Sequence, residues 1–245
     1  MTTPRPPEAA GDDASSRGTP VGRRVVLAMA GLGAVGIVTG SALANRVSSV
    51  AASLPSSVSG LIPGLGGFRF YSVTPTEPDI SPAAYQLSVG GLVDRPATLR
   101  MADLEALPQT TLVETFQCVT GWTVPGVHWQ GVALPDLLAH VGIQRGAKAV
   151  LFTSLDGTYT ESLTLSQAMR RDVIVATQML GGPVSRSHGG PVRLYVAPMY
   201  GYKSIKWLGQ IVVSDRVVPG YWENLGYAVD AWIGDSNGYT GGHAG

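Results

Sequence analysis

The feature that most limits how this chain can fold is an uncharged apolar run from Val25 to Ala44, 20 residues long. About 20 apolar residues suffice to span a bilayer, whereas the apolar core of a secretory signal usually has about 7–15. Burial as an ordinary core helix is disfavoured because the run has no polar face. We therefore expect residues 25–44 to be a cleaved signal peptide or a transmembrane anchor, separate from the folded domain.

The segments on either side of this run support export. Residues 1–24 are rich in proline, alanine, glycine and serine, which predicts a disordered leader, and they end in Arg23-Arg24. A paired arginine before a Gly/Ala-rich apolar run resembles a twin-arginine export signal, and Ala42-Leu43-Ala44 offers a cleavage site. Residues 45–67 read as a flexible linker. We expect the folded domain to span 68–245, in a protein of the cell envelope that is either released or membrane-anchored.

Composition excludes several kinds of partner and site. Lysine plus arginine equals aspartate plus glutamate at 17 each, so no global field attracts nucleic acid, and an anionic ligand needs a local site. The single cysteine excludes an intramolecular disulfide and a zinc site built on several thiolates. With 44% hydrophobic and 14% charged residues, a sizeable core can be buried.

Short strands and short helices alternate along the domain without regular βαβ order. Apolar or alternating runs predict strands at 85–93, 111–119, 149–157, 172–180, 191–198 and 205–215. Short helices are predicted at 98–108 with Thr98 as N-cap, at 131–142 ending at Gly142, and at 163–170 beginning at Thr164 or Ser166. This pattern indicates an α+β domain with mixed β-sheets.

Four segments carry residues that could bind a ligand or take part in catalysis. They are FQCVTGW (116–122), FTSLDG (152–157), SHGGPVRL (187–194) and GYKSIKWL (201–208), with GYWE (220–223) behind the last. In this order, and with the opening FRFYSVTP, they resemble the molybdopterin-binding domain of the sulfite oxidase family, which includes periplasmic sulfoxide reductases. The resemblance covers nearly all of 68–233. It implies the sulfite oxidase-like molybdopterin-binding fold.

The resemblance implies that Cys118 is the catalytic residue and the protein's single ligand to molybdenum. A soft metal suits a thiolate, and the pterin dithiolene supplies two further sulfurs. Taken alone, a cysteine at the end of a strand is more often a small packed hydrophobe. The surrounding FQCVTGW sequence favours the ligand.

The resemblance also implies a set of cofactor contacts. Arg193 can give a bidentate contact to the cofactor's phosphate, and Lys206 with the amides of Ser204 and Ile205 can form an anion-binding turn. We expect Lys203 at the surface or behind the contact residues, Glu223 to orient a loop, and Trp122 and Trp222 to be core or cleft walls. The full set of implied contacts is Phe68, Arg69, Phe70, Tyr71, Ser154, His188, Arg193, Ser204, Ile205 and Lys206.

The implied activity is two-electron oxo transfer to or from a small substrate such as a sulfoxide, sulfite or an N-oxide. The chain has no Cys-x-x-Cys-His haem motif, so we expect a separate redox partner, either a haem or a quinone-linked membrane subunit. Two alternatives remain. One is a cell-wall enzyme with a cysteine nucleophile, because the Ser187–Gly190 segment is similar to the catalytic segment of L,D-transpeptidases. The other is a non-catalytic exported binding domain.

Overall fold

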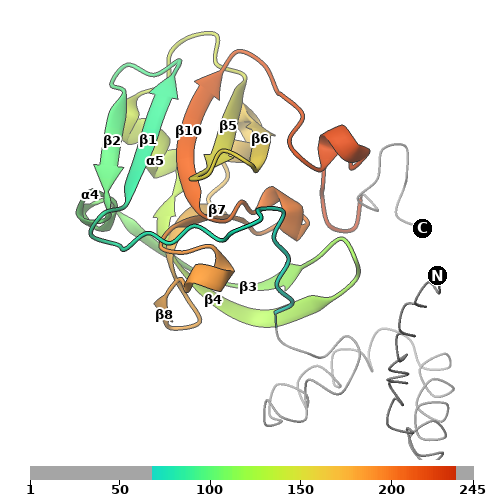
Figure 1. The fold of residues 1–245 in the computed structure, drawn as a ribbon. Coiled ribbons are helices and arrows are strands. Elements are labelled where there is room, and N and C mark those ends of the chain that lie inside the picture. Colours follow the sequence, from blue (N-terminus) through green and yellow to red (C-terminus); the bar gives the residue numbers. More distant parts are fainter. Residues whose placement is uncertain (1–67, 236–245) are drawn as a thin grey trace, which may run out of the picture. The chain divides into compact units, whose positions relative to one another are not determined.

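The structure is a computed structural model that describes residues 68–235 (Figure 1). The leader, apolar run and linker expected within 1–67, and the last stretch 236–245, lie outside the described residues. Across the described part, no helix is both long enough and apolar enough to cross a bilayer.

The first of two sheets has five strands in the order β2-β1-β10-β5-β6. Strands β1 and β10 are parallel, and the other neighbours are antiparallel. In β1 the alternation seen in the sequence holds, since Leu87 and Val89 are buried while Gln86 and Ser88 are exposed. The strands are β1 (Gln86–Gly91), β2 (Ala97–Arg100), β5 (Ala149–Ser154), β6 (Thr160–Thr164) and β10 (Leu208–Ser214).

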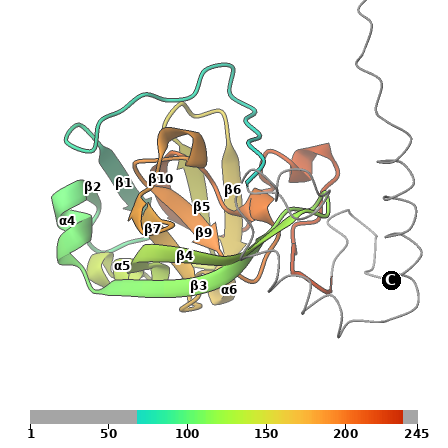
Figure 2. The same cartoon turned by 90° about the horizontal axis from the view of Figure 1, so that it is seen from below.

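The second sheet is antiparallel, with the order β3-β4-β7-β8 and with β9 also pairing with β7. Its first two strands form a long curved hairpin whose turn carries Cys118 (Figure 2). The mixed sheets confirm the α+β expectation. The strands are β3 (Gln109–Gln117), β4 (Thr123–Ala133), β7 (Val173–Met179), β8 (Gly182–Pro183) and β9 (Arg193–Val196).

The helices are short, as expected, but two of them begin later than the sequence indicated. The helix expected at 131–142 begins at Leu134, because residues 131–133 end a strand, and the helix expected at 98–108 begins at Met101. Thr98 is not an N-cap, because it pairs with Ser88 as part of β2. Helix α4 follows Arg100, whose backbone N–H donates to Asp103 at 2.8 Å. The helices are α4 (Met101–Ala106), α5 (Leu134–Val141), α6 (Leu165–Ala168) and the 3₁₀ turns η1 (Arg186–His188), η2 (Gly201–Lys203) and η3 (Glu223–Leu225).

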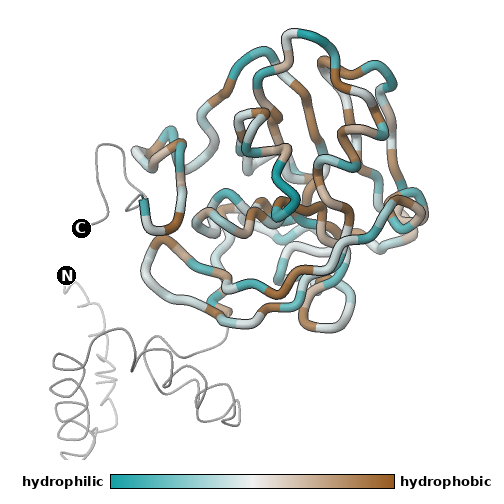
Figure 3. The backbone as a smooth tube through the Cα atoms, turned by 180° about the vertical axis from the view of Figure 1, so that it is seen from behind, coloured by the Kyte–Doolittle hydropathy of each residue, from teal (hydrophilic) through white to brown (hydrophobic). Residues whose placement is uncertain are grey.

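Two buried clusters form the core. The larger takes its aliphatic side chains from both sheets and from α5, and apolar segments follow the strands in Figure 3. The smaller is aromatic and includes Phe116, Trp122, Trp129 and Tyr195. Phe116 and Trp122 flank the turn that holds Cys118 and stack on each other, and Cys118 packs against this aromatic cluster.

Candidate cofactor-binding site

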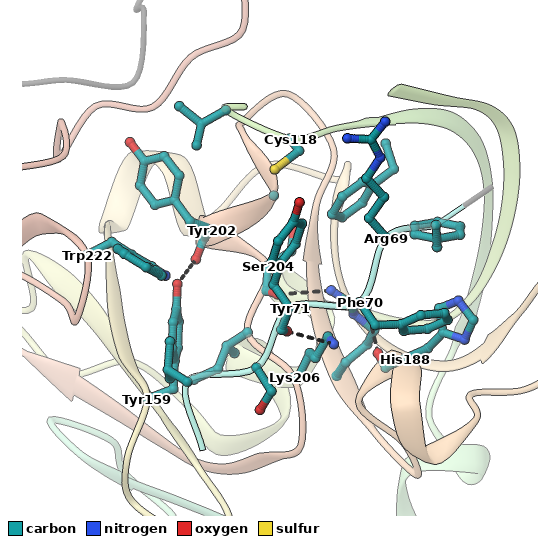
Figure 4. Close-up of a pocket in the computed structure, with 18 of the residues that line it drawn as sticks. Arg69, Phe70, Tyr71, Cys118, Tyr159, His188, Tyr202, Ser204, Lys206 and Trp222 are labelled. Carbon is teal, nitrogen blue, oxygen red and sulfur yellow. Dashed lines mark hydrogen bonds between the residues drawn. The ribbon is translucent and has the colours of Figure 1, made fainter. Parts of the chain in front are cut away.

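A pocket of about 300 Å³ lies beside the turn of the β3–β4 hairpin (Figure 4). It brings together residues 68–74, the hairpin turn, the loop before β9 and the segment 201–207, which are far apart in the sequence. Every residue expected in the site lines this pocket except Ser154: Phe68, Arg69, Phe70, Tyr71, Cys118, His188, Arg193, Ser204, Ile205 and Lys206.

Cys118 is held in the hairpin turn by the backbone. Its N–H donates to Trp122 O at 2.9 Å, and Gly121 donates back to Cys118 O at 3.0 Å. Gly121 has a φ of +92°, a conformation that favours glycine. The hydroxyl of Thr120, which the sequence analysis missed, donates to Cys118 Sγ at 3.2 Å. The thiolate is the form of a cysteine that binds a metal.

Lys206 is a largely buried cation without a carboxylate partner among the described residues. Its Nζ donates to Tyr71 O at 3.1 Å and to Ser187 O at 2.8 Å. Burial first, and then repulsion from Arg193, lower the pKa of Lys206 to about 8, and the charge of Glu77 opposes this shift. Gly189 packs so closely on Lys206 that a Cβ there would lie 2.5 Å from Lys206 Cβ. An anion beside Lys206 would offset this unbalanced charge.

Arg193, at the start of β9, joins two loops of the pocket. It is buried, donates to His188 O at 2.6 Å and to Ser204 O at 3.0 Å, and stacks over Trp129. Burial lowers the pKa of Arg193 to about 10. Its two Nη atoms thus bind backbone carbonyls, and the expected bidentate contact to a phosphate stays a prediction.

His188 lines the pocket beside Phe68 and Phe70. Its ring lies between Phe68 and Phe70, and Nδ1 is 2.8 Å from Ser185 Oγ. Nε2 is buried and has no hydrogen-bond partner in the described part of the chain. The pKa of His188 is lowered by burial first and then by Arg193 and Lys206, so the ring is neutral at neutral pH. A buried polar atom of this kind calls for a ligand.

Two of the expected contacts, Ser154 and the backbone amide of Ser204, form hydrogen bonds within the protein. Ser154 is buried outside the pocket lining, because its hydroxyl donates to Asp156 at 2.6 Å and accepts the N–H of Tyr159 to close a turn. Tyr159, five residues on, reaches the pocket instead. The amide of Ser204 donates to Gly201 O at 3.1 Å and is therefore not free for the expected anion-binding turn.

An aromatic wall forms the side of the pocket opposite His188, and we define it as Tyr159, Tyr202, Trp222 and Tyr227 (Figure 4). The hydroxyl of Tyr159 donates to Tyr202 O at 2.6 Å, and Tyr227 packs on both Tyr202 and Trp222. The expectation that Trp122 and Trp222 are core or cleft walls is confirmed. The tyrosines were missed because they come from three separate segments.

Lys203 is fully buried, so of its two expected places the structure shows the one behind the contact residues and not the one at the surface. It pairs with Glu161 at 2.6 Å and with Glu223, which also accepts the N–H of Gly220. Glu223 therefore orients a loop, as expected, and Lys203 lies behind the pocket wall. No group of three or more histidine, cysteine or acidic side chains within residues 68–235 is arranged to hold a metal.

The fold and the pocket define a class: a mixed α+β domain that presents one soft thiol and a separate basic cradle, which we define as His188, Arg193 and Lys206. A family model described as the oxidoreductase molybdopterin-binding domain matches residues 73–222, and the chain belongs to this family of enzymes. The residues present fit molybdopterin. The open Nε2 of His188 and the unbalanced cation of Lys206 suit a polar, anionic group, and Cys118 suits a soft metal.

Relatives support this assignment at moderate identity. The chain is 33% identical over 150 residues to the oxidoreductase YuiH of Bacillus subtilis, covering 60% of this chain and 75% of YuiH. It is 32% identical to sulfite oxidase of Arabidopsis thaliana, covering 59% and 45%. It is 28% identical to the protein-methionine-sulfoxide reductase catalytic subunit MsrP of Xanthomonas axonopodis, covering 64% and 55%. The chain thus spans about half the length of the last two relatives.

A solved structure supports the fold. The sulfane dehydrogenase SoxCD of Paracoccus pantotrophus matches with a TM-score of 0.54 at 24% identity, covering 58% of this chain and 41% of that one. At this identity the likeness concerns the fold alone, and it confirms the expected sulfite oxidase-like architecture.

Proposed function

We propose that this protein is an exported molybdenum-cofactor oxidoreductase that transfers an oxygen atom to or from a small substrate, with Cys118 as the protein ligand to the metal. The observation that carries this proposal is that Cys118 shares one pocket with the basic cradle, in which Arg193 and Lys206 form no ion pair with a carboxylate among the described residues. When bound, the cofactor supplies a metal that exchanges an oxygen atom and two electrons with substrate.

The protein's own groups divide this work. His188 and Lys206 bind the polar and anionic parts of the cofactor, and Arg193 holds their loops together. The hydroxyl of Thr120 donates to the sulfur of Cys118 and helps to orient it. The aromatic wall excludes water from the other side of the pocket, which strengthens the electrostatic interactions inside.

Among the three substrate classes considered, the neutral ones, sulfoxides and N-oxides, suit the aromatic wall better than sulfite, and we propose a sulfoxide. The aromatic wall offers apolar surface, and its members carry no charge that would hold an anion such as sulfite. The resemblance to MsrP, a protein-methionine-sulfoxide reductase subunit, points the same way. Sulfite and N-oxides serve as comparison substrates in the test below.

The remaining parts of the proposal concern the whole protein. Residues 1–24 would be a twin-arginine leader, 25–44 a signal peptide or anchor, 45–67 a linker, and 68–245 the catalytic domain. Electrons would pass through a separate haem or quinone-linked membrane subunit. Such a partner is consistent with the resemblance to MsrP, which is named as a catalytic subunit.

The competing cysteine-nucleophile hypothesis requires a base on the thiol. In the structure, Nδ1 of His188 bonds Ser185, its Nε2 has no partner in residues 68–235, and the hydrogen-bond partner of Cys118 Sγ is Thr120. Because nucleophile and base are not hydrogen-bonded, the geometry favours the metal ligand.

The test is the metal content and reactivity of protein made in cells that build molybdopterin. We expect stoichiometric molybdenum, a Cys118 that resists iodoacetamide until the cofactor is removed, and turnover of methionine sulfoxide with an artificial electron donor. Cys118→Ser should lower turnover by roughly 100-fold or more, beyond the 10–100-fold typical of outer-sphere residues, with an unchanged unfolding curve. Full activity in Cys118→Ser, or protein without molybdenum, would refute the proposal.

A further inference from the structure

Behind the aromatic wall lies a buried ion cluster, which we define as Lys203, Glu161 and Glu223. These side chains belong to residues that are 0%, 2% and 8% exposed. Lys203 Nζ lies 2.6 Å from Glu161 Oε2 and also bonds Glu223 Oε1. No member belongs to the pocket lining, so the cluster lies outside the cofactor site described above.

The cluster joins three segments, and each segment contributes an aromatic residue to the wall. Glu161 in β6 follows Tyr159, Lys203 in η2 follows Tyr202, and Glu223 in η3 follows Trp222. In Figure 4, Tyr159, Tyr202 and Trp222 lie together on the same side of the pocket. The ion pairs therefore tie together the backbone positions from which these three rings project.

Further contacts bind the last of these segments to β6. Tyr221 N–H donates to Thr160 O at 2.9 Å, and Ser162 Oγ donates to Val218 O at 2.6 Å. The backbone at Gly220 passes so close to β6 that a Cβ would lie 2.5 Å from Thr160 O. Gly220 N–H also donates to Glu223, so the carboxylate holds its own segment as well as Lys203.

A contribution to the free energy of unfolding does not by itself explain why the fold contains this buried ion cluster. Replacing a buried ion triad by apolar residues is often neutral or stabilising, whereas removing one partner is costly. Oε1 of Glu161 has no partner in the described part of the chain, and burial raises the pKa of this carboxyl well above its usual range. A cluster that is not optimised for stability, yet fixes three segments in one geometry, fits a role in specificity.

We propose that the buried ion cluster positions the aromatic wall and thereby sets the shape of the substrate side of the pocket, without taking part in cofactor binding. Lys203, Glu161 and Glu223 are then positioning residues. They act on substrate through Tyr159, Tyr202 and Trp222. The effect on substrate rests on the function proposed above. The effect of the ion cluster on the position of the aromatic wall can be tested without that function.

The first test measures hydrogen exchange in the full-length protein. Lys203→Met leaves two buried carboxylates and can fail to fold, so the charge-neutral pair Lys203→Met/Glu223→Gln is compared with it, and Glu105→Gln on exposed α4 is the matched control. We expect backbone amides of 218–227 to exchange about tenfold faster in the double variant, with β1 and β9 unchanged. Unchanged exchange at 218–227, or an equal rise everywhere, would overturn the proposal.

The second test separates substrate binding from cofactor binding. In the double variant, molybdenum content should equal that of wild type, KM for methionine sulfoxide should rise about tenfold, and kcat should change less. An equal fall in kcat and molybdenum content would place the cluster in cofactor binding and refute its proposed role. If wild-type protein holds no molybdenum, the proposed function fails, while the exchange experiment still decides whether the cluster holds the wall.

Discussion

Two lysines three residues apart have opposite surroundings. Lys203 is enclosed by two carboxylates, whereas Lys206 bonds only the carbonyls of Tyr71 and Ser187 among its described hydrogen-bond partners. A buried cation with matched charge belongs to the folded framework. A buried cation with neutral acceptors and a lowered pKa marks a place where an anion can bind. The charge of the neighbours therefore distinguishes a structural lysine from a ligand-binding one.

The same contrast separates the two sides of the pocket. The aromatic wall is backed by the ion cluster, in which positive and negative groups meet directly. The basic cradle gathers the cations Arg193 and Lys206, which repel each other, beside His188, whose pKa is lowered by burial first and then by these two charges. Behind the aromatic wall the protein itself supplies groups of both signs, whereas at the basic cradle a bound ligand would supply the negative charge.

The largest expected effect is on stability when Lys203 is changed. Lys203→Met leaves Glu161 and Glu223 buried together without a cation, so the free energy of unfolding should fall by about 3–5 kcal/mol. Urea unfolding of the cofactor-free protein measures this. Lys148→Met, at an exposed lysine, is the control. A loss below about 1 kcal/mol would show that the two lysines do not differ as the contrast requires.

Much of the fold followed from local pattern. Alternation predicted β1, Gly142 ended α5, and Thr164 began α6, because each of these depends on residues close in sequence. Thr98 failed as a helix start because its pairing with Ser88 in β1 outweighed its capping tendency. Such pairing is a tertiary interaction that a local window does not contain.

The sequence predicted the site only through motifs whose order along the chain is typical of the family, because the motifs come together only in the folded structure. The cysteine turn, the His-Gly-Gly loop and the segment of Lys206 were found through their order in the chain, and the pocket brings them together. The surroundings of Lys203 were not predictable, because its partners Glu161 and Glu223 are distant in sequence and lie on separate elements. Ser154 lies outside the pocket lining because its hydroxyl closes a local turn with Asp156, which a motif does not reveal.

The ion cluster also predicts a pH dependence of the free energy of unfolding, through Glu161. Burial raises the pKa of Glu161 to about 8, with Lys203 opposing and Glu223 adding to the shift. Between the ordinary glutamate pKa and about 8 the folded protein holds a proton that the unfolded chain releases, so this group's stabilisation declines as pH rises. Glu161→Gln should remove that decline, which is at most about 1.4 kcal/mol per pH unit.

Paired unfolding curves of wild type and Glu161→Gln across this range measure the effect, because all other groups cancel in the difference. Glu105→Gln, at an exposed glutamate, should give a difference that does not change with pH. A constant difference for Glu161→Gln as well would mean that Glu161 is ionised in the fold throughout, and the cluster would then carry net negative charge.

The smallest expected effect on stability is at Lys206, and it is the most informative about function. Lys206→Met removes a buried cation that has no carboxylate partner in residues 68–235 and also removes its bonds to Tyr71 O and Ser187 O. These changes oppose each other, so the free energy of unfolding of the cofactor-free protein should change by less than about 1 kcal/mol. Molybdenum and pterin content should nevertheless fall by about tenfold or more.

Lys206→Met and Lys203→Met/Glu223→Gln should therefore have opposite effects on two measured properties, cofactor content and the hydrogen exchange of 218–227. The first variant should lose cofactor while keeping its stability and the slow exchange of 218–227, and the second should keep cofactor while losing that slow exchange. Because the pKa of Lys206 is lowered to about 8, wild-type cofactor uptake should weaken as pH rises above that value, and uptake by Lys206→Met should not. If both variants lost cofactor to the same extent, the difference in charge between the surroundings of Lys203 and Lys206 would not distinguish the structural lysine from the ligand-binding one.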